Sequence, residues 1–276
     1  MTVHLAESAG FCFGVDRAVS MTEKALDEYG CCWSLGELIH NRDAVEALER
    51  RGLHVAAAVE EVPPGQAVVI RSHGISRQEM EALRDRNCVI LDATCPRVSR
   101  IHKIVQRASE EARQVVIFGE PDHPEVQGIC GWCNGAAVVK NAAEFEQYIA
   151  AGTIVPDQPM TVVFQTTSNK QTSEQTINSL KKQCTNAKFF DTICDATSIR
   201  QAEARELSSS CGAMVVVGGL HSANSVHLAE ICREQCDAVQ FVQNADELDL
   251  SQLLSVDHVG VTAGASTPSW IIKEVV

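Results

Sequence analysis

Residues 88–96 read Cys-Val-Ile-Leu-Asp-Ala-Thr-Cys-Pro, and this stretch decides the fold. An apolar run typical of a buried strand leads through a short turn to Cys95, and the proline that follows suits the first turn of a helix. The same order recurs where Val3-His4-Leu5 leads to Cys12 and where Phe189-Phe190 leads to Cys194. Each cysteine is followed, at one constant spacing, by a glycine that ends a second apolar run: Gly36, Gly119 and Gly218. The sequence therefore predicts three copies of one strand–Cys–helix–strand unit.

The second half of each copy repeats as a buried strand followed by a polar turn. These turns are Arg71-Ser72-His73-Gly74, Gln165-Thr166-Thr167-Ser168 and Ala263-Gly264-Ala265-Ser266-Thr267. Short Val/Ile-rich strands that alternate with amphipathic helices are typical of βαβ units around parallel strands. Because ligands bind at the carboxyl ends of such strands, we expect the polar turns and the cysteine turns to face one central cavity.

No low-complexity linker divides the chain, so we expect one α/β module over residues 1–276. Three pseudo-repeated lobes are expected at about 13–94, 95–193 and 194–276, the last completed by the N-terminal strand within residues 1–12. Ser76-Arg77-Gln78-Glu79 predicts a capping box. The helix after Cys12 is expected to bury one face, formed by Val15, Ala18, Val19, Thr22, Leu26 and Tyr29.

The composition excludes some classes of partner. Lys and Arg number 23 against 36 Asp and Glu, which gives a formal charge of −13, and aromatic residues make up only 5%. This balance argues against nucleic acid or an anionic membrane as the main partner. No export signal or membrane-length apolar run is present, so twelve cysteines indicate a reducing, cytoplasmic setting in which metal or redox roles outrank disulfides.

Cys12, Cys95 and Cys194 occupy equivalent places in the three copies. A single buried cysteine is more often a core residue than a ligand, but equivalence in every copy favours a shared ligand. Three thiolates could hold zinc with an open fourth position, or a [4Fe–4S] cluster with one iron that no protein atom ligates. Ligation by thiolates alone favours the iron–sulfur cluster, since catalytic zinc commonly includes His.

Polar side chains of the repeated turns form a candidate anion site. One such histidine alone could equally be exposed or a helix cap, but three at equivalent turns favour function. Neutral donors of this kind, with helix N-termini, suit a phosphate or diphosphate. Neither a Walker A sequence nor Gly-x-Gly-x-x-Gly occurs, so a nucleotide is less favoured. The candidate donors are His40, His73, His123, Thr166, Ser222, Asn224 and Ser266.

Two further features have competing interpretations. Glu125 is the one carboxylate in these turns that could donate a proton, since partial burial would raise its pKa; the alternative is an exposed glutamate at a helix start. Cys130-Gly131-Trp132-Cys133 is typical of a dithiol redox motif. It has no counterpart in the other copies, so we favour incidental packing.

Eight motifs in order resemble the 4-hydroxy-3-methylbut-2-enyl diphosphate reductase family, also called IspH or LytB, and the resemblance runs from Cys12 to Trp270. They are Gly10-Phe11-Cys12-Phe13-Gly14-Val15, Gly36-Glu37-Leu38-Ile39-His40-Asn41, Arg71-Ser72-His73-Gly74, Asp92-Ala93-Thr94-Cys95-Pro96, His123-Pro124-Glu125-Val126, Gln165-Thr166-Thr167, Asp191-Thr192-Ile193-Cys194 and Ala263-Gly264-Ala265-Ser266-Thr267-Pro268. No one of these motifs would suffice, but eight in register form a strong signal.

The resemblance implies a cloverleaf α/β monomer around one central [4Fe–4S] cluster with three ligands, at Cys12, Cys95 and Cys194. It implies reductive dehydroxylation of the allylic diphosphate to isopentenyl and dimethylallyl diphosphates, the last step of the methylerythritol phosphate route. A ferredoxin or flavodoxin is the implied electron donor. The implied diphosphate ligands are His40, His73, Ser222, Asn224 and Ser266, with His123 nearby, and Glu125 with Thr166 is the implied proton relay, so that Glu125, Thr166 and His123 form the catalytic set.

The chain departs from the family pattern at the third phosphate turn. Ala223 stands where a second serine is usual, and Leu220-His221 stands where Lys-Asn is frequent. Asp122 and Asp195 replace a usual Gly and a common aromatic residue. These changes affect the expected diphosphate affinity more than cluster assembly. Two rival functions stay open: a non-catalytic iron–sulfur sensor on the same scaffold, and a dithiol oxidoreductase that uses Cys130 and Cys133.

Overall fold

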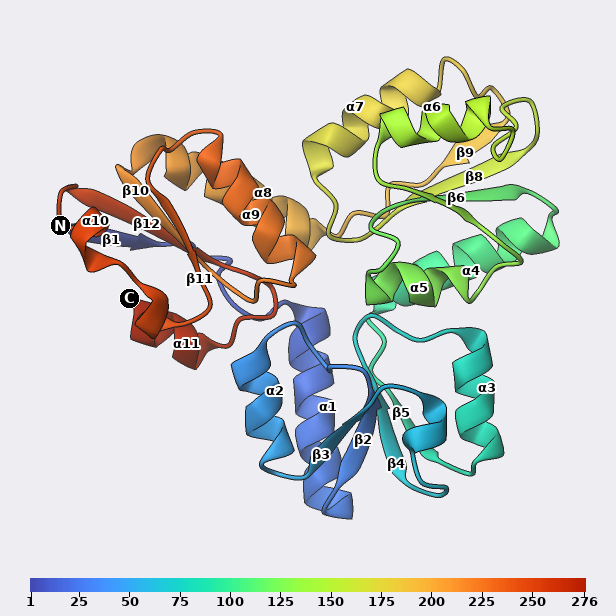
Figure 1. Ribbon diagram of the computed structural model, residues 1–276, viewed down its shortest axis with the longest axis horizontal. Coiled ribbons are helices and arrows are strands. Elements are labelled where there is room, and N and C mark those ends of the chain that lie inside the picture. Colours follow the sequence, from blue (N-terminus) through green and yellow to red (C-terminus); the bar gives the residue numbers. More distant parts are fainter.

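Three similar lobes surround a common centre in the structure, a computed structural model that describes residues 1–276 (Figure 1). Each lobe holds one four-stranded sheet, and every strand pairing is parallel. The predicted three-lobed α/β fold is therefore confirmed. No helix combines the length and the apolar character that crossing a membrane requires.

The first lobe has the sheet order β3-β2-β4-β5. Its elements are α1 (Phe13–Tyr29), β2 (Cys32–Leu35), α2 (Arg42–Glu49), β3 (Leu53–Ala56), η1 (Val59–Glu61), β4 (Ala67–Ile70), α3 (Arg77–Asp85) and β5 (Val89–Asp92).

The second lobe repeats this order as β7-β6-β8-β9. Its elements are α4 (Pro96–Glu110), β6 (Gln114–Phe118), α5 (Pro124–Cys130), β7 (Ala137–Val139), α6 (Ala142–Ala150), β8 (Met160–Phe164), α7 (Lys170–Leu180) and β9 (Ala187–Phe189).

The third lobe completes its sheet with the first strand of the chain. In the order β11-β10-β12-β1, the strand β1 (Thr2–Leu5) takes the place that β5 and β9 hold in the other lobes, with Val3 opposite Val259. The remaining elements are α8 (Asp195–Ser210), β10 (Ala213–Val217), α9 (Ala223–Arg233), β11 (Val239–Val242), η2 (Ala245–Glu247), α10 (Leu250–Leu253), β12 (His258–Ala263) and α11 (Ser269–Val275).

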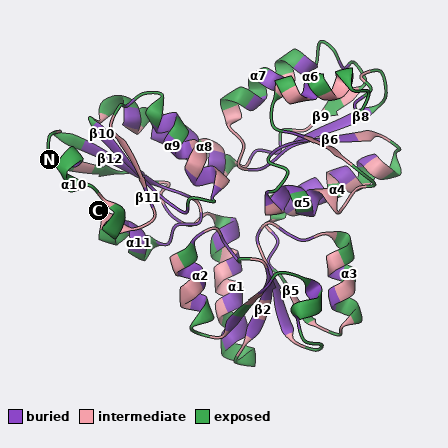
Figure 2. Cartoon of the chain, in the orientation of Figure 1, coloured by how far each residue is buried: buried purple, intermediate pink, exposed green.

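Continuous apolar runs make the central strands. All residues of β4, β8 and β10 are buried, as expected for parallel strands covered by helices on both faces. Figure 2 shows these buried strands inside an exposed outer layer of helix surface. The predicted capping box of Ser76 and Glu79 is present at the start of α3. One expectation was wrong: Tyr29 is 41% exposed, because it is the last residue of α1, directly before the left-handed Gly30.

The same hydrogen bond joins the cysteine turn to the polar turn in each lobe. Cys12 N–H donates to Ala265 O at 3.1 Å, Cys95 N–H to Ser72 O at 3.0 Å, and Cys194 N–H to Thr166 O at 3.0 Å. These turns follow adjacent parallel strands at their carboxyl ends. The bond therefore fixes each cysteine beside the polar turn of its sheet, on the edge that faces the centre of the molecule.

Candidate functional site

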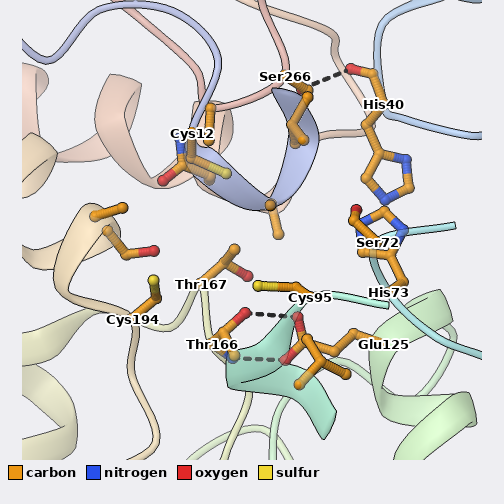
Figure 3. Close-up of a pocket in the computed structure, with 18 of the residues that line it drawn as sticks. Cys12, His40, Ser72, His73, Cys95, Glu125, Thr166, Thr167, Cys194 and Ser266 are labelled. Atoms are coloured by element: carbon orange, nitrogen blue, oxygen red, sulfur yellow. Dashed lines mark hydrogen bonds between the residues drawn. The ribbon is translucent and has the colours of Figure 1, made fainter. Parts of the chain in front are cut away.

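One central cavity brings together every site residue that the sequence predicted. Figure 3 shows most of them pointing into a shared space between the three lobes. The predicted residues that line the cavity are Cys12, His40, His73, Cys95, His123, Glu125, Thr166, Cys194, Ser222, Asn224 and Ser266.

The three cysteines are the N-cap residues of α1, α4 and α8. Helix N-termini carry partial positive charge, which stabilises nearby thiolates. All three thiols are free, and their sulfur atoms turn toward one another in Figure 3. Burial raises the pKa of the Cys95 thiol, and the Cys12 and Cys194 thiols act in the same direction. A metal would remove this cost, because it binds the thiolate form.

The space between the thiols depends on Gly14. A Cβ atom at this position would lie 2.9 Å from Cys95 Sγ and 3.9 Å from Cys12 Sγ. Both sulfurs therefore border the same small volume, which any larger residue would fill. Three thiols at the starts of α1, α4 and α8, around a space kept open by a glycine, fit a cluster with three cysteine ligands.

A buried cation stands beside these thiols. Arg200, on α8, is 5% exposed and donates from Nη2 to Gly10 O at 2.7 Å and from Nη1 to Ala196 O at 2.9 Å. Burial lowers its pKa, whereas the charges of Cys12 and Cys194 favour the cationic form. Arg200 thus offsets negative charge at the thiols and ties α8 to the loop before Cys12.

Three histidines from two lobes form a compact cluster, with His40 and His73 from the first lobe and His123 from the second. Their ring centroids are 4.6 Å apart for His40 and His73, 5.3 Å for His40 and His123, and 5.4 Å for His73 and His123. Burial lowers the pKa of His40 to about 4 and of His123 to about 3, and lowers the pKa of His73 well below its usual value. The cluster is therefore neutral near pH 7.

The tautomer of His123 favours an anion over a metal ion in this cluster. The ligand atoms of the three rings lie within 4.8 Å of one another, which is compatible with a metal site. However, His123 Nδ1 accepts a hydrogen bond from the Glu125 backbone N–H at 3.1 Å. The neutral ring then carries its proton on Nε2, which makes that atom a donor rather than a metal ligand.

The third lobe adds polar side chains, of which Asn224 has no hydrogen-bond partner of its own. Asn224 is 3% exposed, and neither its Oδ1 nor its Nδ2 atom has a hydrogen-bond partner. Ser222 caps α9 through Ser225 N–H, and Ser266 Oγ donates to His40 O at 3.1 Å. Buried amides are normally hydrogen-bonded, so the bare side chain of Asn224 indicates a ligand.

Glu125 is held in place by Thr166. It is 2% exposed, its Oε1 accepts from Thr166 N–H at 2.7 Å, and its Oε2 accepts from Thr166 Oγ1 at 2.6 Å (Figure 3). Burial raises the pKa of Glu125, while the Thr166 hydrogen bonds oppose this shift. The alternative of an exposed helix-start glutamate is wrong, and a buried carboxyl with a raised pKa is suited to carry a proton.

Several lining residues were not predicted from the sequence. Ser72 and Thr167 adjoin predicted residues in their turns, whereas Arg97 and Thr197 lie in the first turns of α4 and α8. Arg97 follows the predicted ligand Cys95 by two residues, and Thr197 follows Cys194 by three. This spacing could have identified them. Gly14 has the same signal, since it follows Cys12 by two residues, whereas Arg200 gave no comparable signal.

The Cys130-Gly131-Trp132-Cys133 motif lies outside the cavity. Burial raises the pKa of the Cys130 thiol and raises that of Cys133 to about 11. Redox-active dithiols need a lowered thiol pKa, so this environment counts against the dithiol interpretation.

Of the residues that depart from the family pattern, one lines the cavity. Ala223 lines it as the first residue of α9, whereas Leu220 is 51% exposed and His221 is also exposed. Asp195 forms an ion pair with Arg97 between the second and third lobes.

Comparisons with known proteins agree over the whole chain. The family described as LytB protein matches residues 3–276. The 4-hydroxy-3-methylbut-2-enyl diphosphate reductases of Syntrophotalea carbinolica and Geobacter sulfurreducens are each 40% identical, over 100% of this chain and 97% and 96% of their own lengths.

Two solved structures share the fold. One, described as (E)-4-hydroxy-3-methyl-but-2-enyl diphosphate reductase, the terminal enzyme of the non-mevalonate pathway, superposes with a TM-score of 0.71 at 36% identity, over 100% of this chain and 98% of its own. The E-1-hydroxy-2-methyl-but-2-enyl-4-diphosphate reductase from Plasmodium falciparum gives a TM-score of 0.92 at 25% identity, over 98% and 85%. With a family match that spans nearly every residue and relatives aligned end to end, the chain belongs to the LytB family.

Proposed function

We propose that this protein is a 4-hydroxy-3-methylbut-2-enyl diphosphate reductase, an oxidoreductase that forms isopentenyl and dimethylallyl diphosphates in the last step of the methylerythritol phosphate pathway. The observation that carries the proposal is one cavity lined by three thiols, a cluster of neutral histidines and a buried carboxyl. The names of the full-length relatives support it. Two electrons and two protons replace the substrate C–O bond by C–H and release water.

Cys12, Cys95 and Cys194 would hold one [4Fe–4S] cluster. The free thiols at three helix N-termini and the open space at Gly14 support this assignment. With three protein ligands, such a cluster supplies electrons and a Lewis-acidic iron for the substrate hydroxyl. Arg200 would keep the negative charge of this centre from destabilising the lobes around it.

The histidines and the third lobe would bind the diphosphate. His40, His73 and His123 present ring N–H donors, and Asn224 offers an unpartnered amide. Ser222 and Ser266 add hydroxyl groups, and α9 directs its N-terminus at the cavity. Anchoring the diphosphate at a distance from the thiols orients the hydroxyl-bearing carbon toward them.

Glu125 would deliver the proton that lets the hydroxyl leave as water. Burial raises its pKa, which favours the protonated form, and the two hydrogen bonds from Thr166 hold the carboxyl in one orientation. His123, whose Nδ1 accepts from the Glu125 N–H, couples the proton donor to the diphosphate site.

The electrons would come from a separate carrier, a ferredoxin or flavodoxin, because the sequence has no flavin or nicotinamide fingerprint. We further propose a cytoplasmic monomer acting as one catalytic module, with lobes at about 13–94, 95–193 and 194–276 plus 1–12. Twelve cysteines support a reducing compartment.

Anaerobic purification followed by iron and sulfide analysis tests the cluster, and turnover with reduced viologen tests the reaction. We expect about four irons per chain and both isomeric diphosphate products. Substrate-dependent spectral change without product would instead support the non-catalytic sensor.

A further inference from the structure

Helix α5 runs from the histidine cluster to a seam between the first and second lobes. It begins at His123, which caps it, and ends at Cys130. The turn beyond its end contacts the segment that follows His73: Trp132 Nε1 donates to Ile75 O at 2.9 Å, and Arg77 N–H donates to Gly131 O at 3.3 Å. One short helix thus has a site histidine at its start and hydrogen bonds to the neighbouring lobe just beyond its end.

A glycine allows this close approach, because a Cβ atom on Gly131 would overlap the side chain of Ser76. Gly128, one turn earlier, also lies close, but its Cβ atom would make only an ordinary contact of 3.4 Å with His73 O. The backbone of α5 and its final turn therefore lie directly against the turn that carries His73. This explains why a glycine stands inside the Cys130-Gly131-Trp132-Cys133 motif.

His102 completes the seam from α4. It is 6% exposed, and its ring stacks on Trp132 with centroids 5.2 Å apart and planes 15° from parallel. On its other side it meets Gly74, where a Cβ atom would lie 2.6 Å from His102 Cε1. Gly74 also has φ +74°, so this position favours glycine for two reasons. The residue directly after His73 is therefore held against α4.

We propose that Trp132 and His102 are positioning residues that set the distance between His73 and His123, and so the fit of the diphosphate. The two histidines belong to different lobes, yet their ring centroids are only 5.4 Å apart. Contacts across the seam, rather than the long covalent path between the lobes, must hold them there. The proposal rests on the proposed function and gives the Cys130–Cys133 motif a part in substrate geometry instead of dithiol chemistry.

The test is Trp132→Phe, which keeps an aromatic ring against His102 but removes the hydrogen bond to Ile75. Trp33→Phe is the matched control, because Trp33 also lies against a histidine, His54, with ring centroids 4.8 Å apart, but the two residues lie on neighbouring strands of the first lobe, β2 and β3, rather than across the seam. Iron content, kcat and KM with reduced viologen, and the dissociation constant of inorganic diphosphate by calorimetry are measured on each reconstituted protein.

We expect Trp132→Phe to raise KM and the diphosphate dissociation constant about fivefold, the equivalent of one hydrogen bond, with iron content and kcat nearly unchanged. His102→Gln, which removes the stacked ring, should shift the same two constants. Trp33→Phe and the double change Cys130→Ser with Cys133→Ser should shift neither.

Wild-type KM and diphosphate affinity in both seam variants would overturn the proposal, as would a loss confined to thermal stability or iron content. The proposed function is judged separately, by turnover of the wild-type protein. Calorimetry with inorganic diphosphate requires no turnover. The seam variants therefore test the positioning role of Trp132 and His102 even if the wild-type protein does not catalyse the proposed reaction.

Discussion

Replacing Gly14 by Ala should separate cluster assembly from folding. The new methyl carbon would lie 2.9 Å from Cys95 Sγ and 3.1 Å from Cys95 Cβ. Non-bonded carbon contacts are comfortable at about 3.5–4.0 Å, so the sulfur must move by roughly an ångström. Metal–ligand distances tolerate deviations of only about 0.2 Å. Cys95 would therefore rotate away from the shared space, and the cluster would lose a ligand.

In the metal-free protein, by contrast, Gly14→Ala should not reduce the stability of the fold. Gly14 lies in the first turn of α1, and alanine is favoured over glycine in helices by up to about 1 kcal/mol. Without a cluster, Cys95 can adopt another rotamer at little cost. The melting temperature of the metal-free variant should stay unchanged or rise by about 2–4 °C.

The assay is anaerobic reconstitution with iron and sulfide, followed by iron content and visible absorption per chain. Gly128→Ala is the control, since Gly128 is also helical and its added Cβ would meet nothing closer than 3.4 Å and no thiol. We expect the control to load normally and Gly14→Ala to bind iron substoichiometrically. A Gly14→Ala protein with full iron and a wild-type spectrum would refute the placement of the cluster at this space.

Four further outcomes are expected. Cys95→Ser should lose the stable cluster, and normal iron content with normal visible absorption would contradict the ligand assignment. Glu125→Gln should bind substrate normally but turn over at least about 100-fold more slowly; a wild-type rate would remove Glu125 from the proton path. Ala223→Ser should tighten diphosphate binding by up to about fivefold, and calorimetry that shows no gain would mean that the other donors suffice. Burial lowers the pKa of His102 to about 4 and of His123 to about 3, from 6.5. As the pH falls, these histidines therefore bind protons in the unfolded chain before they do so in the folded protein. Their contribution to the free energy of unfolding is complete above pH 6.5 and is lost toward pH 4, at about 1.4 kcal/mol per pH unit for each histidine. Thermal melts of the metal-free protein should show a shallower decline for His102→Gln, and equal slopes would contradict its neutral burial.

The sequence predicted the lobes and the site because both rest on local signals. Apolar runs mark the strands, and a glycine follows β2, β6 and β10 directly, as expected from Gly36, Gly119 and Gly218. Ligands gather at the carboxyl ends of parallel strands, so turns that repeat in the sequence had to meet in space. The cysteines, histidines and Glu125 were found in this way.

Other parts depend on contacts between lobes and leave no local pattern. Arg200 resembles any helical arginine until Gly10 O is found beside it. Gly14 matters only because Cys95, from another lobe, approaches it. Trp132 belonged to a motif that suggested redox chemistry, and its hydrogen bond to Ile75 and its stacking on His102 identify it as part of a seam.

The pairing of β1 with β12 has a consequence for how the protein matures in the cell. On the ribosome, β1 is made first and β12 after every other strand, yet the two must join before the third sheet is complete. Cys12, which follows β1, reaches its final place only through that late pairing. Nascent chains can therefore hold at most two of the three thiols in position, so a ligand shared by all three thiols could bind only after β12 has been made.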